Sequence, residues 1–402
     1  MRPFAILSSL SLALLLAGAA AAQTWAPQSS GTSASLSDVH FVSPTTGFAV
    51  ADGGLLLSTT DGGTTWSSRV LNAALDNQGL AFNAAGSVGI IVTDAGSVWR
   101  STDGGATWAL VPTGMSDGRA AVAWGTDAVV WVAGRDGNAA VSTDAGATWT
   151  LRPTGSAERT EGMAAAGAQE AWVVGRSGEI RHTANGGASW TSQPSGTASD
   201  LKDIQMLDAS TGYIAGNDNV VLKTTNGGAT WTNVATAGVS GDGLFFLDAA
   251  TGWVVGDVGQ IWFTSTGGAS WALQASGTAQ ALNRVHFANA SRGVAVGDAG
   301  TIVRFGGVVA AEDGPSAGVA LEIAPNPVRD RAAVTLSVPL AAQVRAVVVD
   351  ALGRRVAVLH DGPLAAGTHH VALGVAALPS GVYTVHVTSG EATTRRRLTV
   401  AR

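Results

Sequence analysis

Carboxylates that recur at a fixed spacing are the residues of this sequence best placed to do chemistry. Asp61, Asp103 and Asp144 each stand in a short turn that reads TTDGGTTW, STDGGATW and STDAGATW. Two carboxylates that face one cleft could hydrolyse a glycosidic bond, and several carboxylates in one loop could bind calcium. Because each turn offers only one carboxylate, a structural role is the favoured interpretation of these residues, and a calcium site is the alternative.

The other reactive side chains form no recognisable catalytic set. A sialidase needs a tyrosine nucleophile with a glutamate and three arginines, but the chain has two tyrosines, Tyr213 inside a repeated strand and Tyr383 near the C-terminus. The seven histidines show no HExxH spacing. His40 and His286 occupy matching VHF segments and could form a metal pair, although satisfied polar residues of inner strands are the favoured interpretation. No nucleophile elbow, phosphate loop, cofactor motif or metal motif is present.

The composition limits the kinds of structural element that can hold these residues in place. Of the 402 residues, 46% are hydrophobic and 13% are charged, which supports packed cores and argues against disorder. The 53 glycines indicate many tight turns rather than helices. The net charge of −6 disfavours nucleic acid as a partner. The absence of cysteine excludes disulfides and thiolate chemistry.

The N-terminal segment has the composition of a secretory signal peptide. Arg2 is followed by the apolar run FAILSSLSLALLLAGAAAA, which ends in small residues. We expect residues 1–22 to be removed before Gln23. The run is too short and wrongly flanked for a membrane span, and no later segment is long and apolar enough, so no transmembrane segment is expected after cleavage.

A repeat of about 40 residues organises the next part of the chain. Six tryptophans that end the turns, from Trp66 to Trp271, follow one another at intervals of 42, 41, 41, 41 and 40 residues. A fixed period of this length without helical patterning is typical of propeller blades of four short strands. A second segment, of the type TGWVVGDVG, occurs seven times.

The difference between six turns and seven strand segments predicts how the ring closes. The last repeat stops before its fourth strand, and the mature N-terminus begins with QTWAPQSSGT, in which Trp25 lies 41 residues before Trp66. We expect the strand 24–28 to join the blade formed by residues 282–305, which would remove two exposed sheet edges. The sequence therefore predicts a seven-bladed β-propeller over residues 23–306.

Each turn residue has a physical reason in this design. Asp or Asn accepts backbone N–H bonds within its own turn, glycine tolerates positive φ, and the tryptophan can pack between adjacent sheets. The residues assigned this structural role are Asp61, Trp66, Asp103, Trp108, Asp144, Trp149, Asn185, Trp190, Asn226, Trp231, Trp271 and Trp25.

STDGGATW and STDAGATW match the Asp-box, or bacterial neuraminidase repeat, at every defined position. A chain of such boxes at this period resembles the photosystem II stability/assembly factor family. The resemblance covers most of residues 23–306 and implies a seven-bladed propeller. It says little about function, because Asp-boxes are structural wherever they occur.

The composition changes after residue 306. Residues 307–319 read as a linker, and residues 320–402 contain alternating apolar strands that predict a small Ig-like β-sandwich. The segments APNPVRD, VDALGRRV and LPSGVYTVHV resemble the type A C-terminal sorting domain of the type IX secretion system. That resemblance implies recognition by the outer-membrane translocon and assigns the motif residues Pro325, Asn326, Pro327, Gly353, Arg354, Gly381 and Tyr383.

Side chains that vary while the repeat stays constant are the candidate binding residues. Aligning the innermost strands places Asp38, Gly79, Ala121, Gly162, Asp203, Gly243 and Arg284 at one register. A solvated rim with ion pairs such as Asp38 with Arg284 is the simpler interpretation. The candidates for a ligand face at the channel rim are Asp38, Arg119, Glu161, Lys202, Asp203, Asp242 and Arg284.

The sequence thus predicts an all-β protein in which a seven-bladed propeller, closed by its N-terminal strand, precedes a small sandwich. The leading hypothesis is a secreted or outer-membrane surface protein that travels through the periplasm, is exported by the type IX translocon and binds an unknown protein or glycan ligand without catalysis. The alternative is a surface carbohydrate-active enzyme, such as a divergent glycoside hydrolase or sialidase-like propeller.

Overall fold

The computed structural model of the chain describes residues 23–116, 121–134, 137–308, 320–324, 326–338, 342–349, 354–365, 367–376, 378–389 and 392–401. The expected signal peptide and the linker segment 309–319 therefore lie outside the described residues. The chain divides into two compact units, of which the first is Gln23–Val309 and the second includes Ala310–Arg402. Both consist of β-strands with three short 3-10 turns, so the predicted all-β class is confirmed.

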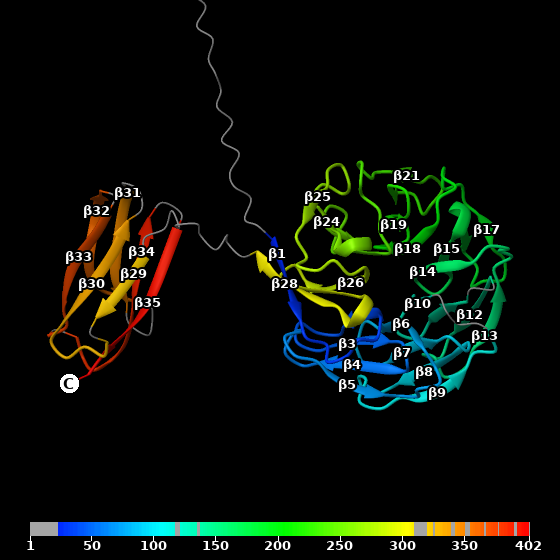
Figure 1. The fold of residues 1–402 in the computed structure, drawn as a ribbon, viewed down its shortest axis with the longest axis horizontal. Helices are drawn as coiled ribbons and strands as arrows, with labels where there is room; N and C mark the ends of the chain where they lie inside the picture. The colour runs from blue at the N-terminus through cyan, green and yellow to red at the C-terminus, as the bar shows by residue number, and fades with distance from the viewer. Residues whose placement is uncertain are drawn as a thin grey trace, which may run out of the picture. The chain divides into compact units, whose positions relative to one another are not determined.

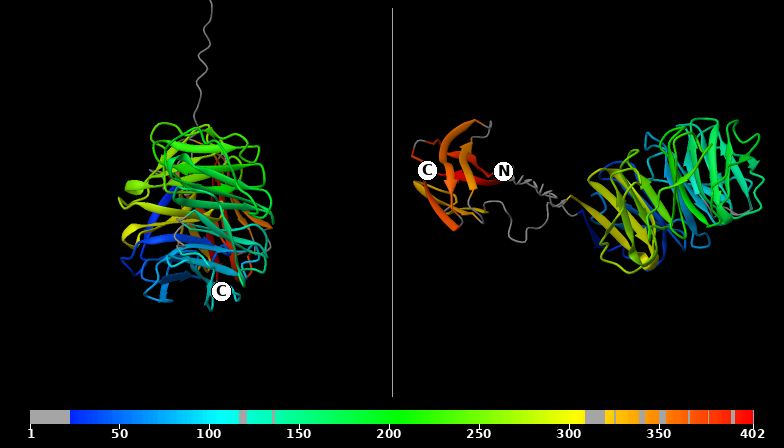
Figure 2. Two further views of the ribbon diagram at one scale, coloured as in Figure 1. Left: turned by 90° about the vertical axis from the view of Figure 1, so that its right-hand side faces the viewer. Right: turned by 90° about the horizontal axis from the view of Figure 1, so that it is seen from above.

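The described residues of the first unit form seven four-stranded antiparallel sheets that follow one another around a common axis (Figure 1) and are seen from other sides in Figure 2. In order from the axis outward, the first three sheets are β2 (Leu36–Phe41), β3 (Gly47–Ala51), β4 (Leu55–Thr59) and β5 (Ser67–Val70); β6 (Asn77–Phe82), β7 (Gly89–Thr93), β8 (Ser97–Ser101) and β9 (Ala109–Pro112); and β10 (Ala121–Trp124), β11 (Val130–Ala133), β12 (Asn138–Ser142) and β13 (Thr150–Pro153).

The next three sheets are β14 (Thr160–Ala166), β15 (Glu170–Gly175), β16 (Ile180–Thr183) and β17 (Thr191–Ser192); β18 (Leu201–Met206), β19 (Gly212–Gly216), β20 (Val220–Thr224) and β21 (Thr232–Asn233); and β22 (Gly243–Phe246), β23 (Gly252–Val255), β24 (Ile261–Thr264) and β25 (Ala272–Gln274). The 3-10 turns η1 (Arg176–Gly178), η2 (Asp257–Gly259) and η3 (Asp298–Gly300) join second to third strands.

The seventh sheet combines the two ends of the unit. Its strands are β26 (Leu282–Asn289), β27 (Arg292–Gly297), β28 (Ile302–Val308) and β1 (Gln23–Gln28). Strand β1 pairs antiparallel with β28 and places Trp25 opposite Phe305. The outermost strand of this sheet therefore comes from the start of the chain.

Burial falls from the middle of each sheet to its outer edge. Second strands such as β3 and β7 are buried at every position, whereas the fourth strand β5 is exposed throughout. The second strand has a neighbouring sheet on both faces, which explains its unbroken apolar sequence, and the fourth strand borders solvent. This gradient accounts for the repeated hydrophobic segment that stands ahead of each turn.

Seven apolar clusters fill the spaces between consecutive sheets, and one of them joins the seventh sheet to the first. Each cluster includes one repeat tryptophan, either buried or packed against it. The seven are Trp25, Trp66, Trp108, Trp149, Trp190, Trp231 and Trp271. The tryptophan of each sheet thus contributes to the contact with the preceding sheet.

The described part of the second unit forms two sheets around one apolar cluster. One sheet has β29 (Ala320–Ala324), β30 (Arg331–Val338) and β33 (Gly367–Gly374), and the other has β32 (Arg355–Leu364), β31 (Ala342–Val349), β34 (Gly381–Ser389) and β35 (Ala392–Val400). Alternation along β30, where Val334 and Leu336 face inward, is the pattern of a strand with one buried face.

Candidate functional site

The carboxylates of the repeated aspartates accept hydrogen bonds within their own turns. Asp103 Oδ1 accepts hydrogen bonds from Ser101 Oγ at 2.8 Å and from the Thr107 N–H at 2.9 Å, and its Oδ2 accepts from Thr107 Oγ1 at 2.6 Å. The turns of Asp61 and Asp144 repeat this arrangement. Among the described residues, no group of three or more metal-ligating side chains could hold an ion.

The amide and hydroxyl versions of the box keep the same geometry. Asn185 Oδ1 accepts the Ser189 N–H at 3.0 Å, and its Nδ2 donates to Ser189 Oγ at 2.9 Å. Asn226 does the same with Thr230, whereas Thr266 accepts the Ser270 N–H through its hydroxyl. A negative charge is therefore not required for the turn to form.

Hydrogen bonds to the carboxylate predict a loss of stability in acid. The Thr107 hydroxyl, the Thr107 N–H and Ser101 lower the pKa of Asp103 to about 2. Because the folded pKa lies below the unfolded value of about 3.9, the stabilisation is present above pH 4 and is lost as the pH falls toward 2. Asp103→Asn is expected to reduce the decline of the unfolding free energy between pH 4 and pH 2, measured by urea titration. An unchanged decline would contradict this role.

One turn residue carries conformational strain. Ala145 has φ 57°, in the left-handed region, whereas its counterpart Gly104 has φ 68°. A β-carbon opposes this conformation by about 1 kcal/mol. We expect Ala145→Gly to raise the free energy of unfolding by about 1 kcal/mol and Gly104→Ala to lower it by about 1 kcal/mol. A β-carbon at Gly104 would meet only Gly86 O, at 3.6 Å, so the pair compares backbone strain without a clash. Equal denaturation midpoints would exclude this effect.

Each box is tied to the preceding sheet through a backbone carbonyl of its turn. Arg100 Nε, for example, donates to Ala145 O at 2.7 Å across one junction between sheets. In each pair a side-chain nitrogen donates to a backbone carbonyl oxygen. The pairs, with the donor first, are Arg304 and Gly62, Arg69 and Gly105, Arg100 and Ala145, Arg152 and Gly186, Gln193 and Gly227, and Lys223 and Gly267. At the junction that has no box, Trp25 Nε1 donates to Gln274 Oε1 at 2.8 Å. The predicted box residues therefore lie at contacts between sheets.

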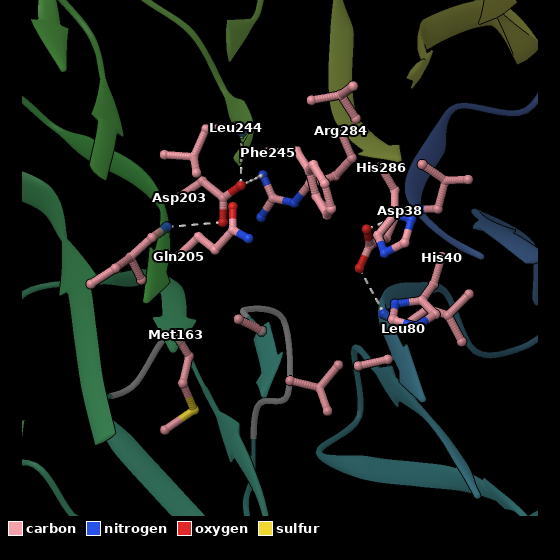
Figure 3. A pocket seen from close by; sticks show the side chains of 16 residues that line it. Asp38, His40, Leu80, Met163, Asp203, Gln205, Leu244, Phe245, Arg284 and His286 are labelled. Carbon is pink, nitrogen blue, oxygen red and sulfur yellow. Dashed lines mark hydrogen bonds and ion pairs between the residues drawn. The ribbon is translucent and has the colours of Figure 1, made fainter. Parts of the chain in front are cut away.

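The innermost strands surround a central cavity of about 210 Å³. All seven contribute to its lining, which mixes Asp38, Asp203 and Arg284 with His40, His286 and apolar side chains (Figure 3). Of the seven positions aligned from the sequence, Asp38, Ala121, Asp203 and Arg284 line this cavity, whereas the three glycines at this register do not. Because the scaffold around these positions repeats, their side chains are where a ligand could be recognised.

A β-bulge decides which candidate residues face the cavity. The register between first and second strands shifts at Leu36/Asp38, Leu201/Asp203 and Leu282/Arg284, and also between Thr160 and Gly162. A bulge inserts one unpaired residue and re-aims its neighbours. Asp38, Asp203 and Arg284, which follow three of these bulges, line the cavity, whereas Gly162 does not.

The candidate residues that directly precede the aligned register positions are not part of the cavity lining. Glu161 and Lys202 are the bulge residues themselves, and Asp242 directly precedes β22. Glu161 pairs with Arg159 at 2.9 Å and with Arg176 at 3.5 Å, and Lys202 lies 3.7 Å from Asp200. These three candidates do not line the cavity. Arg119 lies outside the described residues.

Asp38 and Asp203 connect neighbouring sheets in the same way. Asp38 accepts the N–H of Val39 and the N–H of Leu80 in the next sheet, each at 2.8 Å. Asp203 accepts the corresponding N–H groups of Ile204 and Leu244, each at 3.0 Å. Burial raises the pKa of Asp38 to about 6 and also raises that of Asp203, while Arg284 opposes both shifts.

Arg284 is the cation of the cavity. Its Nη1 lies 3.7 Å from Asp203 Oδ2 and donates to the Asp242 carbonyl. The ion pair therefore forms with Asp203 rather than with Asp38, contrary to the pair suggested from the sequence, because the guanidinium reaches back toward the preceding sheet. Burial would lower the pKa of Arg284, but the surrounding carboxylates, Asp203 first, raise it.

The two histidines meet across the junction between the seventh and first sheets. The rings of His40 and His286 lie 4.4 Å apart, and His286 Nδ1 accepts the Phe41 N–H at 3.3 Å. Burial lowers the pKa of His40 to about 4 and that of His286 well below its usual value. Both rings are therefore neutral at physiological pH, and His286 has a backbone donor from the first sheet as its hydrogen-bond partner.

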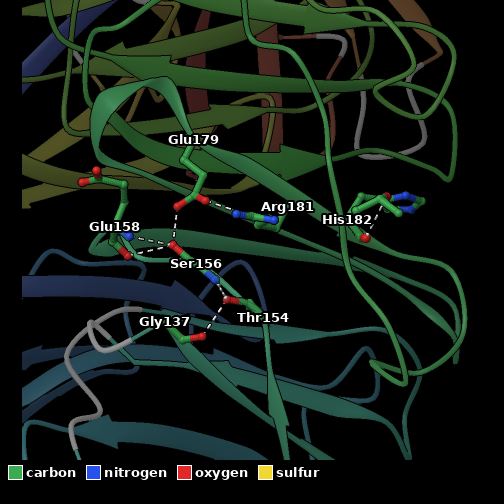
Figure 4. Close-up of polar contacts among 8 residues, drawn as sticks. Gly137, Thr154, Ser156, Glu158, Glu179, Arg181 and His182 are labelled. Carbon is green, nitrogen blue, oxygen red and sulfur yellow. Dashed lines mark hydrogen bonds and ion pairs between the residues drawn. The ribbon is translucent and has the colours of Figure 1, made fainter.

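A serine from the connection between the third and fourth sheets contacts a glutamate of the fourth sheet, and the two could be mistaken for a catalytic pair. Ser156 Oγ donates to Glu179 Oε2, and Arg181 Nε binds the other oxygen at 2.8 Å (Figure 4). Ser156 Oγ also accepts the Glu158 N–H at 3.0 Å, and Thr197 and Thr278 use their hydroxyls in the same way in later repeats. The serine is thus a turn residue whose glutamate neighbour is held by an arginine.

The described sorting-motif residues stabilise the second unit. Asn326 Oδ1 accepts the Thr399 N–H at 2.8 Å, which attaches the start of the domain to its last strand. Tyr383 is buried in the core and its hydroxyl donates to Pro379 O at 2.9 Å. Pro327 precedes the bridge between Val328 and Val400. Gly381 begins β34 and Arg354 is exposed, while Pro325 and Gly353 lie outside the described residues.

Sequence reasoning missed part of the cavity lining. Gln205, Phe245 and Met163 line it, and Gln205 exchanges hydrogen bonds of 3.0 and 2.7 Å with the backbone of Phe246 in the next sheet. Gln205 and Phe245 stand two residues beyond the aligned register, in the position that His40 and His286 occupy. Extending the same alignment by two residues would have found them.

Comparison with solved structures confirms that this is a propeller-like protein. The structure described as "YCF48 bound to D1 peptide" superposes with a TM-score of 0.60 at 18% identity, covering 70% of this chain and 96% of that one. "YCF48 from Cyanidioschyzon merolae" gives 0.58 at 19% identity, covering 70% and 98%. The WD40 propeller domain of Doa1 gives 0.59 at 10% identity, covering 70% and 96%. At these identities the likeness shows the fold.

Family models name the two parts of the chain more specifically. The model of the photosynthesis system II assembly factor YCF48 matches residues 17–116 and 157–242, and that of the secretion system C-terminal sorting domain matches residues 322–401. Two segments of the first part therefore match the photosynthesis system II assembly factor model and the last part matches the sorting-domain model, in agreement with the two resemblances drawn from the sequence. No curated protein matches the sequence significantly. Within the described residues, no helix has the length and apolar character that a membrane crossing requires.

Proposed function

We propose that the chain is a non-enzymatic binding or assembly module, exported through its C-terminal domain and displayed at the cell surface or released. The observation that carries this proposal is the state of the two carboxylates in the central cavity. Asp38 and Asp203 are each fixed by backbone N–H groups of two sheets. Both oxygens of each carboxylate already accept a fixed backbone donor, which favours a structural or recognition role over proton transfer to a substrate.

The architecture that we propose for this role is a closed ring of seven blades. The pairing of β1 with β28 and the cluster between the seventh and first sheets support closure by the N-terminal strand. The two sheets around one core in the second unit support an Ig-like sandwich. Residues 1–22 serve as a signal peptide for passage into the periplasm, residues 307–319 as a linker, and residues 320–402 as the segment that the type IX translocon recognises.

A peptide or protein segment is the ligand class that we favour. One structural neighbour is described with a bound peptide. The photosystem is not proposed as the target here, because a sorting tail of this type implies a different cellular setting. The alternative function remains a surface carbohydrate-active enzyme.

A screen of the purified secreted chain on sialosides and on plant and microbial glycans tests the choice between binding and catalysis. We expect no turnover. Turnover that disappears on Asp203→Asn but persists on Asp103→Asn would overturn the proposal, because the first variant alters the cavity and the second alters only a turn. Capture of partners from the native cell envelope identifies the ligand, and the intact mass of the secreted form shows whether residues 320–402 are retained.

A further inference from the structure

The central cavity contains more acidic than basic charge. Arg284 is engaged by Asp203, with Nη1 and Oδ2 3.7 Å apart. Asp38 has no ion pair within 4.0 Å among the described residues, and its oxygens accept only backbone N–H groups. The two carboxylates of the lining therefore share one cation, Arg284, which lies closer to Asp203.

Three further carboxylates lie within electrostatic reach of one another outside the cavity lining. Asp242 directly precedes the innermost strand of the sixth sheet, and Asp257 and Asp298 lie in the turns η2 and η3 of the sixth and seventh sheets. Burial raises the pKa of Asp242 first, and the nearby charge of Asp257 raises it further, which outweighs Lys202 and Arg284. Acidic charge in this region favours the approach of a cation.

Apolar side chains form part of the cavity lining, beside the histidines and Arg284. Val39, Leu80 and Val122 line the cavity with Met163, and Phe245 presents an aromatic ring from the sixth sheet (Figure 3). Such walls can cover an aliphatic stem, and the face of an aromatic ring attracts a cation within about 6 Å. The volume of about 210 Å³ suits a single side chain rather than a folded surface.

We propose that the channel binds a primary ammonium or guanidinium group on an aliphatic stem, as a lysine or arginine side chain of a peptide or a free polyamine would present it. The cation lies beside Asp38, and the stem packs against the apolar walls. This inference rests on the proposed binding function and names the chemistry of its ligand. Asp203 remains occupied by Arg284 and holds the cavity in shape.

The pH dependence of binding follows from the titratable groups that face Asp38. These are Asp203, Arg284, His40 and His286, and Asp242 lies near Arg284 outside the lining. Burial raises the pKa of Asp38 to about 6, while the histidines stay neutral because burial lowers the pKa of His40 to about 4 and that of His286 well below its usual value. Binding should therefore weaken as the pH falls from 8 to 5.

Calorimetric titration of the secreted chain with acetyl-Gly-Gly-Lys-Gly-Gly-amide tests the proposal. Its norleucine and glutamate counterparts serve as matched probes, because norleucine keeps the stem without the charge. We expect the lysine peptide to bind at least about tenfold more tightly than either counterpart. Its affinity should fall about tenfold between pH 8 and pH 5. Equal affinities, preference for glutamate, or no binding of the lysine peptide would overturn the proposal. A parallel titration with spermidine shows whether a free polyamine is preferred to the peptide.

Asp38→Asn keeps the size of the side chain and removes its charge. We expect it to lower the affinity for the lysine peptide at least about tenfold. Asp103→Asn, which changes a turn outside the channel, should leave binding unchanged. If Asp38→Asn does not fold, the pH series on the unaltered chain decides the question. Capture of an envelope partner that is equally strong with Asp38→Asn would reject the cation site while the binding function stands, whereas glycan turnover would reject the function itself.

Discussion

Replacing Trp25 by alanine is expected to lower the free energy of unfolding by about 3–5 kcal/mol. The indole is 5% exposed. It packs against Phe287 and Phe305 with ring centroids 5.7 and 5.3 Å apart, and its Nε1 donates to Gln274 Oε1. The substitution would leave a cavity at the junction between the sixth and seventh sheets and would also detach the strand that completes the seventh.

Urea denaturation followed by tryptophan fluorescence and circular dichroism measures this loss. Leu273→Ala is the matched control, because Leu273 is 58% exposed on the neighbouring strand β25, and its truncation should change stability by less than about 0.5 kcal/mol. A loss of less than about 1 kcal/mol for Trp25→Ala would show that β1 contributes little to the ring.

Arg284→Leu is expected to cost about 3 kcal/mol of unfolding free energy, because removal of one partner leaves a buried charge without compensation. Asp203 and Arg284 keep only 16% and 20% of their side chains exposed, so solvent screens the pair weakly. The carboxylate of Asp203 would lose its nearest cation and the carbonyl of Asp242 would lose its donor.

The double variant Asp203→Asn with Arg284→Leu separates the ion pair from simple packing. Since the double variant leaves no unpaired charge at this position, it should be more stable than the sum of the two single losses predicts, by about 1–3 kcal/mol. Strictly additive losses in thermal or chemical denaturation would mean that the two side chains act independently. The same variants retain Asp38, so folded protein can still be tested for cation binding.

The repeat made most of the first unit predictable. Trp66 and its successors recur at almost constant intervals, and the burial of a tryptophan between two sheets explains why that interval must be kept. The position of Trp25 likewise indicated the seventh sheet, because it stands one interval ahead of Trp66. These inferences needed only the pattern along the chain.

The cavity was less predictable, because its geometry depends on one unpaired residue in five of the seven inner strands. Strict alternation places Lys202 and Asp203 on opposite faces without indicating which face turns to the axis, and the bulge at Leu201/Asp203 decides it. The partner of Arg284 could not be read from the register either. Asp38 and Asp203 share one register, and only the reach of the guanidinium toward the sixth sheet selects Asp203.

The pairing of Gln23 with Val308 brings the two ends of the first unit together as neighbours in one ladder. A short peptide could therefore join them, and new termini could be opened in an exposed connection between two other sheets. Such a circular permutant would keep every sheet while moving the interrupted one elsewhere in the ring. Comparing the stabilities of such permutants would show whether the sheet built from both ends of the unit has a preferred position. New termini would also allow a reporter to be attached beside any chosen sheet.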